Sequence, residues 1–218
     1  MRKFAGLVAK LGTSTKTNDK LAALDRYFNE AADADKVWMI ALFRGRRPKR
    51  TVTTTQLWEW CREITGLPAW LFEESYHTVG DLAETIALLL PEAASAAGET
   101  AETESLAYYL VQLMELGKKE EAEKKDFVQR CWATMNKEER FVFNKLITGG
   151  FRIGISQQTV VNALAKTAGV DAAVVAHRIS GDWDAATTPF AALLSGEGAG
   201  SEVSRPYPFY LAYALEGE

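Results

Sequence analysis

One loop of this chain combines residue types that could bind an anion. The segment ITGGFRIGISQQ (147–158) has three glycines around an arginine, and a serine then opens a helical pattern. Glycines let the backbone approach a phosphate, an arginine can add a bidentate contact, and a helix start offers unpaired N–H groups. The candidate contact residues are Gly149, Gly150, Arg152, Gly154, Ser156 and Gln157.

A nucleotide triphosphate does not fit this loop. Gly149 and Gly154 have the glycine spacing of a P-loop, but Ile155 stands where the lysine of that motif must be. No strand pattern precedes the loop either. A purely structural interpretation stays open, in which glycines end one helix and Ser156 caps the next. The two roles are compatible, because a capped helix start can also face a phosphate.

A second loop concentrates positive charge. The run RGRRPKR (44–50) holds five of the 25 basic residues, in a chain whose formal net charge is −4. Such a patch on an otherwise acidic protein can attract a polyanion, although a solvated surface loop is the simpler interpretation. The candidates are Arg46, Arg47, Lys49, Arg50, Thr53 and Thr54, with Lys16 and Thr17 in the TSTKTN turn as a weaker pair.

The sequence predicts an all-α fold, a compact bundle of about twelve helices. Apolar residues recur at helical spacing between capping residues and glycines, for example at Leu21, Leu24 and Phe28. We expect Thr17 or Asn18 to cap one helix, and another helix to begin with Thr78 and Asp81 in capping-box spacing. Strand signals are nearly absent before RPYPFYLAYAL (205–215).

The helices also suggest an internal repeat. A shift of 103 positions places residues 36–70 over 139–173 without a gap. Thr53 then lies over Ser156, and Gly66 over Gly169, with very few identities. The shared pattern predicts two helix–loop–helix halves, each with a phosphate-binding helix start. Two such elements on one rigid body could hold the two backbones of a duplex without reading its sequence.

Bulk properties agree with a globular protein in a reducing compartment. The chain has 218 residues, 47% of them apolar, and no apolar run near the ~20 residues that span a bilayer. Cys61 and Cys131 are the only cysteines and show no metal-ligand spacing. We interpret the first residues, MRKFAGLVAKLG, as a helix and expect a cytoplasmic, nucleoid-associated protein.

The segment FNKLITGGFRIGISQQTVVNALAK closely resembles the DNA-binding-domain signature of ATP-dependent DNA ligases of the eukaryal, archaeal and related bacterial kind. The resemblance extends from FAGLVAKLGTSTKTNDKLAAL to RPYPFYLAYAL. It implies a helical DNA-binding domain over 1–203 that grips nicked duplex across the minor groove. It also implies an extended linker, 204–218, toward a nucleotidyltransferase domain, which works with an OB-fold domain. The arginine-rich run departs from the family's usual glycine-bearing loop.

The chain itself is expected to be non-catalytic. The family joins DNA, in repair, recombination or replication, through an adenylated lysine in a K-x-D-G motif, and the sequence has none. The nearest string, Lys124-Lys125-Asp126-Phe127, lacks the glycine. No metal or cofactor is therefore expected in this chain, and ATP and Mg²⁺ would belong to the catalytic domain. The alternative function is a helical protein-interaction scaffold whose basic loop binds an acidic partner.

Overall fold

The protein is all-helical, as predicted. The computed structural model describes residues 1–92, 103–149 and 155–195, which hold twelve α-helices and no strand. In chain order they are α1 (Arg2–Thr13), α2 (Thr17–Glu30), α3 (Asp33–Phe43), α4 (Thr54–Thr65), α5 (Ala69–Val79), α6 (Leu82–Leu89), α7 (Leu106–Glu115), α8 (Glu121–Thr134), α9 (Lys137–Thr148), α10 (Gln157–Ala168), α11 (Ala172–Ser180) and α12 (Phe190–Ser195). A 3₁₀ turn, η2 (Leu116–Lys118), follows α7. The segment RPYPFYLAYAL lies outside the described residues.

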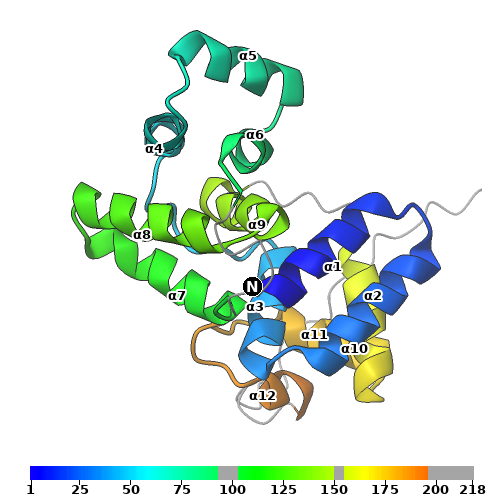
Figure 1. The fold of residues 1–218 in the computed structure, drawn as a ribbon. Helices are drawn as coiled ribbons and strands as arrows, with labels where there is room; N and C mark the ends of the chain where they lie inside the picture. Colours follow the sequence, from blue (N-terminus) through cyan, green and yellow to red (C-terminus); the bar gives the residue numbers. More distant parts are fainter. Residues whose placement is uncertain (93–102, 150–154, 196–218) are drawn as a thin grey trace, which may run out of the picture.

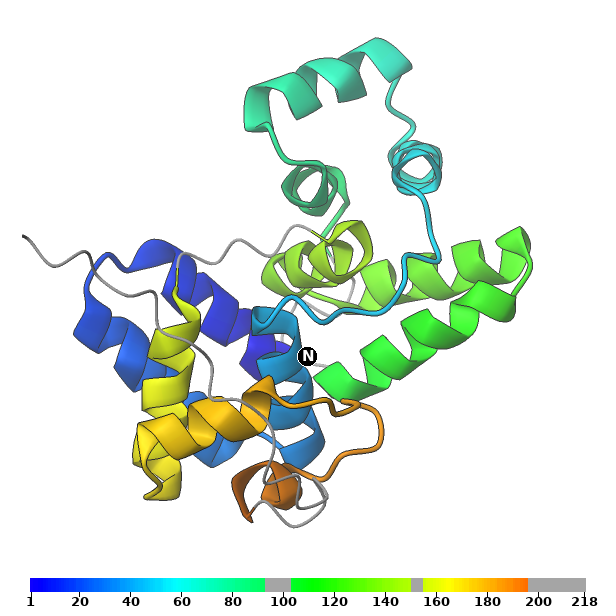
Figure 2. The same ribbon diagram turned by 180° about the vertical axis from the view of Figure 1, so that it is seen from behind.

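The helices form three groups around α3 and α9 (Figure 1). The hairpin of α1 and α2 packs against α9 and α10, and α11 and α12 extend this side of the molecule. The hairpin of α7 and α8 projects on the opposite side. Helices α4, α5 and α6 form a third group, which is joined to the body mainly where α6 lies on α9. The loop from α3 to α4 runs across the face that Figure 2 shows.

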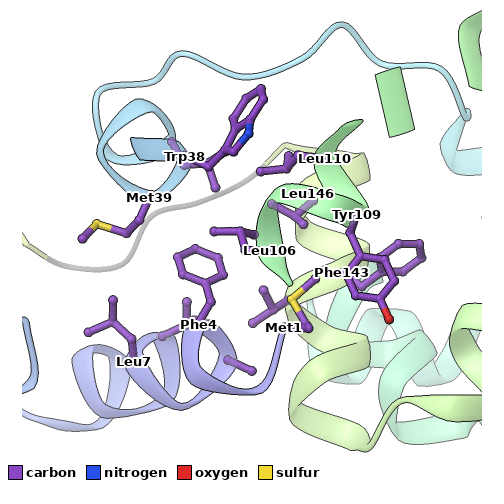
Figure 3. Packing of buried hydrophobic residues seen from close by; sticks show 14 of the residues in the cluster. Met1, Phe4, Leu7, Trp38, Met39, Leu106, Tyr109, Leu110, Phe143 and Leu146 are labelled. Atoms are coloured by element: carbon purple, nitrogen blue, oxygen red, sulfur yellow. The ribbon is translucent and has the colours of Figure 1, made fainter. Parts of the chain in front are cut away.

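Large apolar side chains from α1, α3, α7 and α9 meet at the centre (Figure 3). Phe4, Met39, Leu106 and Phe143 are each at most 1% exposed, and Tyr109 contacts Phe143 edge to face with ring centroids 5.8 Å apart. Burying a side chain of this size stabilises a fold by about 1.5–3 kcal/mol. The core therefore joins the first helix to helices from the middle of the chain in one body.

Buried polar groups fix α9 to its neighbours. The Asn144 side chain accepts a hydrogen bond from Trp132 Nε1 (2.8 Å) and donates one to the Ala83 carbonyl (3.2 Å). The Arg140 guanidinium donates to the carbonyls of Trp132 and Pro91, both at 2.6 Å. Because unpaired buried polar groups are costly, these bonds specify how α9 sits between α6 and α8.

Two predicted N-terminal caps were wrong. Helix α2 begins at Thr17, but its N-cap is Lys16 and not Thr17 or Asn18, and the lysine side chain makes no capping bond. Thr78 lies inside the last turn of α5 and does not begin a helix. Asp81 is itself the cap of α6, and its carboxylate accepts a hydrogen bond from the Glu84 N–H at 3.0 Å. The signal was misread because a turn of only Gly80 and Asp81 separates α5 from α6.

No single helix among the described residues is long and apolar enough to cross a membrane. Helices α10 and α11 reach the required length and composition only as a pair, which is bent by 116°.

Candidate nucleic-acid interface

The fold brings the basic loop to the C-terminal end of α9, where the second predicted anion-binding loop begins. Arg50, in the basic loop, donates from Nη2 to the carbonyl oxygen of Thr148 at 2.6 Å. The Arg47 guanidinium lies against the α-carbon of Gly149, at the place where a β-carbon would project. Residues about 100 positions apart in sequence therefore form one surface, and positive charge lies beside the negative end of the α9 dipole.

Gly149 meets two requirements of this surface. Its φ of 83° is left-handed, and its N–H closes the last turn of α9 by donating to the Lys145 carbonyl at 2.8 Å. A residue with a β-carbon is strained in this conformation. The missing side chain also leaves the space that Arg47 occupies. The predicted helix stop is confirmed, and the close approach of Arg47 is an additional finding.

Two helix starts follow the loops. Thr53 caps α4 in a capping box, in which the Gln56 N–H donates to Thr53 Oγ1 at 3.2 Å and the Thr53 N–H donates to Gln56 Oε1 at 2.9 Å. Ser156 caps α10 by accepting from the Thr159 N–H at 3.1 Å. The Ser156 cap matches the sequence prediction. Each cap satisfies one N–H of the first turn, so further first-turn N–H groups stay available to an anion.

The two helices that follow have matching limits. Helices α4 and α10 are both 12 residues long, and each ends at a left-handed glycine, Gly66 or Gly169. Their limits coincide under the shift of 103 positions. Their neighbours differ, because α4 packs on α6 whereas α10 packs on α2, α11 and α3. The wider repeat of two halves stays a prediction.

The residues of the basic run do not share one environment. Arg47, Lys49 and Arg50 are exposed. Arg46 is partly buried and donates to backbone carbonyls beyond α11. Arg44 is partly buried too, and burial, and secondarily the charge of Arg46, lower the pKa of its guanidinium. The run is thus partly buried, at Arg44 and Arg46, and its other three cations are exposed to solvent.

The third, weaker candidate lies at the start of α2. Lys16 and Thr17 are exposed there, and α2 packs closely on α10. A groove between α1 and α2 also holds Lys3, Lys10 and Arg26 beside Lys16. The acidic side chains of Asp19 and Glu30 line the same groove, and Glu30 pairs with Arg26 at 2.9 Å. Its net positive charge is therefore small.

Three predicted residues, Gly150, Arg152 and Gly154, lie outside the described residues. Gln157 is the exposed first residue of α10, and Thr54 is the exposed first residue of α4. Sequence reasoning missed the partners of the arginines, namely the Thr148 carbonyl and the α-carbon of Gly149. The shift of 103 positions aligned the two loops but carried no signal that the basic loop touches the end of α9.

Two features that could have taken part in covalent chemistry have structural surroundings in the described ranges. The string around Lys125 lies on the surface of α8, where Lys125 pairs with Glu63 and Asp126 pairs with Arg130 at 2.9 Å. Burial raises the pKa of the Cys61 and Cys131 thiols to about 12, so neither is a nucleophile at neutral pH. No group of three or more metal-ligating side chains occurs in these ranges.

The surface thus combines exposed arginines with two capped helix starts, which are groups that can bind phosphates. The model of the family "DNA ligase N terminus" matches residues 1–165, about three quarters of the chain. The chain therefore belongs to the DNA ligase N-terminal domain family, which is a family of DNA-binding domains. A comparison with curated proteins found no match.

Proposed function

We propose that this chain grips nicked duplex DNA through both phosphate backbones across the minor groove, without reading the base sequence. It would act as the non-catalytic DNA-binding part of an ATP-dependent DNA ligase in repair or replication. The adenylated lysine, ATP and Mg²⁺ would belong to a nucleotidyltransferase domain, and an OB-fold domain would complete the closure around the DNA. The protein would be located in the cytoplasm, in association with the nucleoid.

The observation that carries this proposal is the meeting of the basic loop with the C-terminal end of α9. Arg47 and Arg50 are fixed there by Gly149 and the Thr148 carbonyl, and both remain exposed. Exposed arginines suit phosphates because the planar guanidinium can donate two parallel hydrogen bonds. A guanidinium held by the protein loses less conformational entropy on binding than a free one.

The helix starts supply a second set of contacts. The first turns of α4 and α10 expose polar residues, Thr54 and Gln157, beside N–H groups that carry partial positive charge. Such groups bind phosphates regardless of base sequence. We assign α4 with the basic loop to one backbone, and α10 with the start of α2 to the other. This assignment rests on the matching caps of the two helices and on the packing of α2 against α10.

Fluorescence anisotropy with a labelled nicked duplex tests the proposal. Affinity should be similar for unrelated base sequences and should fall as salt rises, with a log–log slope of about −0.9 for each neutralised phosphate. Polyglutamate of equal charge serves as the acidic-protein control. Tight binding of polyglutamate without binding of duplex DNA would instead support the interaction-scaffold function.

A further inference from the structure

Arg46 has contacts unlike those of its neighbours in the basic run. Its Nη1 donates to the carbonyl of Trp183 at 3.0 Å, and its Nη2 donates to the carbonyl of Gly181 at 2.6 Å. The guanidinium carbon also lies 4.9 Å from the centre of the Trp183 ring. One side chain thus joins the basic loop to the segment that follows α11, across more than 130 positions of sequence.

The backbone of Arg46 is fixed as well. Its N–H donates to the Ala41 carbonyl at 2.8 Å, and the Gly45 N–H donates to the Leu42 carbonyl at 3.0 Å. Gly45 has a φ of 77°. These two bonds and the left-handed glycine form a Schellman motif at the end of α3. The motif sets the direction in which Arg46 leaves the helix and the point at which the basic loop begins.

Residues 181–183, which Arg46 contacts, are also fixed by the fold. Trp183 donates from Nε1 to the carbonyl of Ile179 at 2.9 Å, and Ile179 is 2% exposed in the core. Trp183 also packs against the hydrophobic core. Residues 181–183 therefore offer Arg46 a fixed pair of carbonyls. They lie beyond the segment matched by the family model, which ends at residue 165.

We propose that Arg46 is a positioning residue: it holds the basic loop against residues 181–183 so that Arg47 and Arg50 face the DNA backbone. The inference rests on the proposed function and assigns different roles to neighbouring arginines. Arg46 already uses two N–H groups on carbonyls and one face on an aromatic ring. Arg47 and Arg50 keep their exposure to solvent. Residues 181–183 become part of the DNA-binding apparatus without touching DNA.

The test compares Arg46→Lys and Arg46→Ala with two controls. Lysine keeps the charge, but its ammonium cannot span both carbonyls and stack on the ring. Arg62→Ala is the matched structural control, because Arg62 also lies over a tryptophan (Trp58, 4.6 Å) and donates to a carbonyl (Leu67, 3.1 Å). Arg47→Ala is the control for loss of a phosphate contact.

Two readouts separate the roles. The first is the Trp183 indole N–H resonance, assigned by its loss in Trp183→Phe among the six tryptophans. The second is affinity for nicked duplex as a function of salt. Both Arg46 variants should shift the Trp183 resonance and weaken binding on the order of threefold to tenfold, with the salt slope unchanged. Arg47→Ala should reduce the slope by about 0.9, and Arg62→Ala should change neither readout.

A double-mutant cycle completes the experiment. The effect of Arg46→Ala on affinity should vanish when Arg47 and Arg50 are already alanine, because nothing remains to be positioned. Full affinity in Arg46→Lys, a slope loss in Arg46→Ala, or additive effects in the cycle would each overturn the proposal. If the wild-type chain binds no duplex, the proposed function fails. If the Trp183 resonance does not shift in the Arg46 variants, the contact between Arg46 and Trp183 is refuted independently of DNA binding.

Discussion

Replacing Gly149 by alanine should separate the two roles of this residue. A β-carbon at this position must adopt a left-handed backbone, and it must also displace the Arg47 guanidinium. The first effect acts on folding, and the second acts on the DNA-binding surface. A chain with several left-handed glycines provides the control that tells these effects apart.

The matched control is Gly169→Ala. Gly169 ends α10 with a φ of 64°, against 83° for Gly149, and a β-carbon there would meet no atom within 4 Å. Both variants should therefore lose about 1–2 kcal/mol of unfolding free energy from backbone strain. At about 2–4 °C per kcal/mol for a chain of this size, both should show a melting temperature lowered by several degrees.

Only Gly149→Ala should affect DNA binding. An arginine–phosphate hydrogen bond contributes about 1.5–3 kcal/mol, so its loss lowers affinity on the order of tenfold to a hundredfold at low salt. Anisotropy titrations of wild type, Gly149→Ala, Gly169→Ala and Arg47→Ala measure this. In a chain that already carries Arg47→Ala, Gly149→Ala should cause no further loss of DNA affinity, because no guanidinium remains to be displaced. Equal affinities for the two glycine variants would refute the reasoning and leave Gly149 as a helix stop alone.

Three further predictions concern stability and chemistry. Asn144→Ala should lower the unfolding free energy measured in urea by about 1–3 kcal/mol for each partner left unpaired, Trp132 Nε1 and the Ala83 carbonyl; a change under about 0.5 kcal/mol would contradict the buried network. Because burial raises the pKa of the Cys61 and Cys131 thiols from 9.0 to about 12, the folded state holds their protons longer than the unfolded state. The contribution of the thiols to the free energy of unfolding is therefore fully present below pH 9. Between pH 9 and 12 it should fall by about 1.4 kcal/mol per pH unit for each thiol. When both cysteines are replaced by alanine, this loss of unfolding free energy between pH 9 and 12 should disappear. The same pH dependence in the wild type and the double variant would contradict the burial of the thiols. Incubation with ATP labelled at the α-phosphate should leave the chain unlabelled, and a covalent adenylate would reveal a nucleophilic lysine that the K-x-D-G search missed.

Local signals predicted much of the fold. The cap at Ser156 and the helix stop at Gly149 were readable, because each satisfies a backbone requirement within a few residues. The errors at Lys16 and Thr78 have the same local origin. Several hydroxyl and acidic residues stand near each of these helix starts, and sequence alone does not rank them.

The candidate site was only partly predictable, for a physical reason. The loops could be recognised by their glycines and charges, but their contact depends on tertiary packing. Nothing local distinguishes Arg46, which binds carbonyls of residues 181–183, from Arg47, which lies on Gly149. The partners are about 100 or more positions away, and a backbone carbonyl leaves no side-chain signature in a sequence.

The central proposal is that the domain holds both backbones of a nicked duplex across the minor groove. Hydroxyl-radical footprinting of the wild-type chain on a nicked duplex tests it most directly, since the radical attacks sugars through that groove. We predict protection of both strands on either side of the nick, staggered as the minor groove requires, and the same pattern for unrelated sequences. Arg47→Ala and Arg50→Ala should weaken the protection on one strand first. Protection confined to one strand, centred on a major groove or absent at saturating protein would contradict the account.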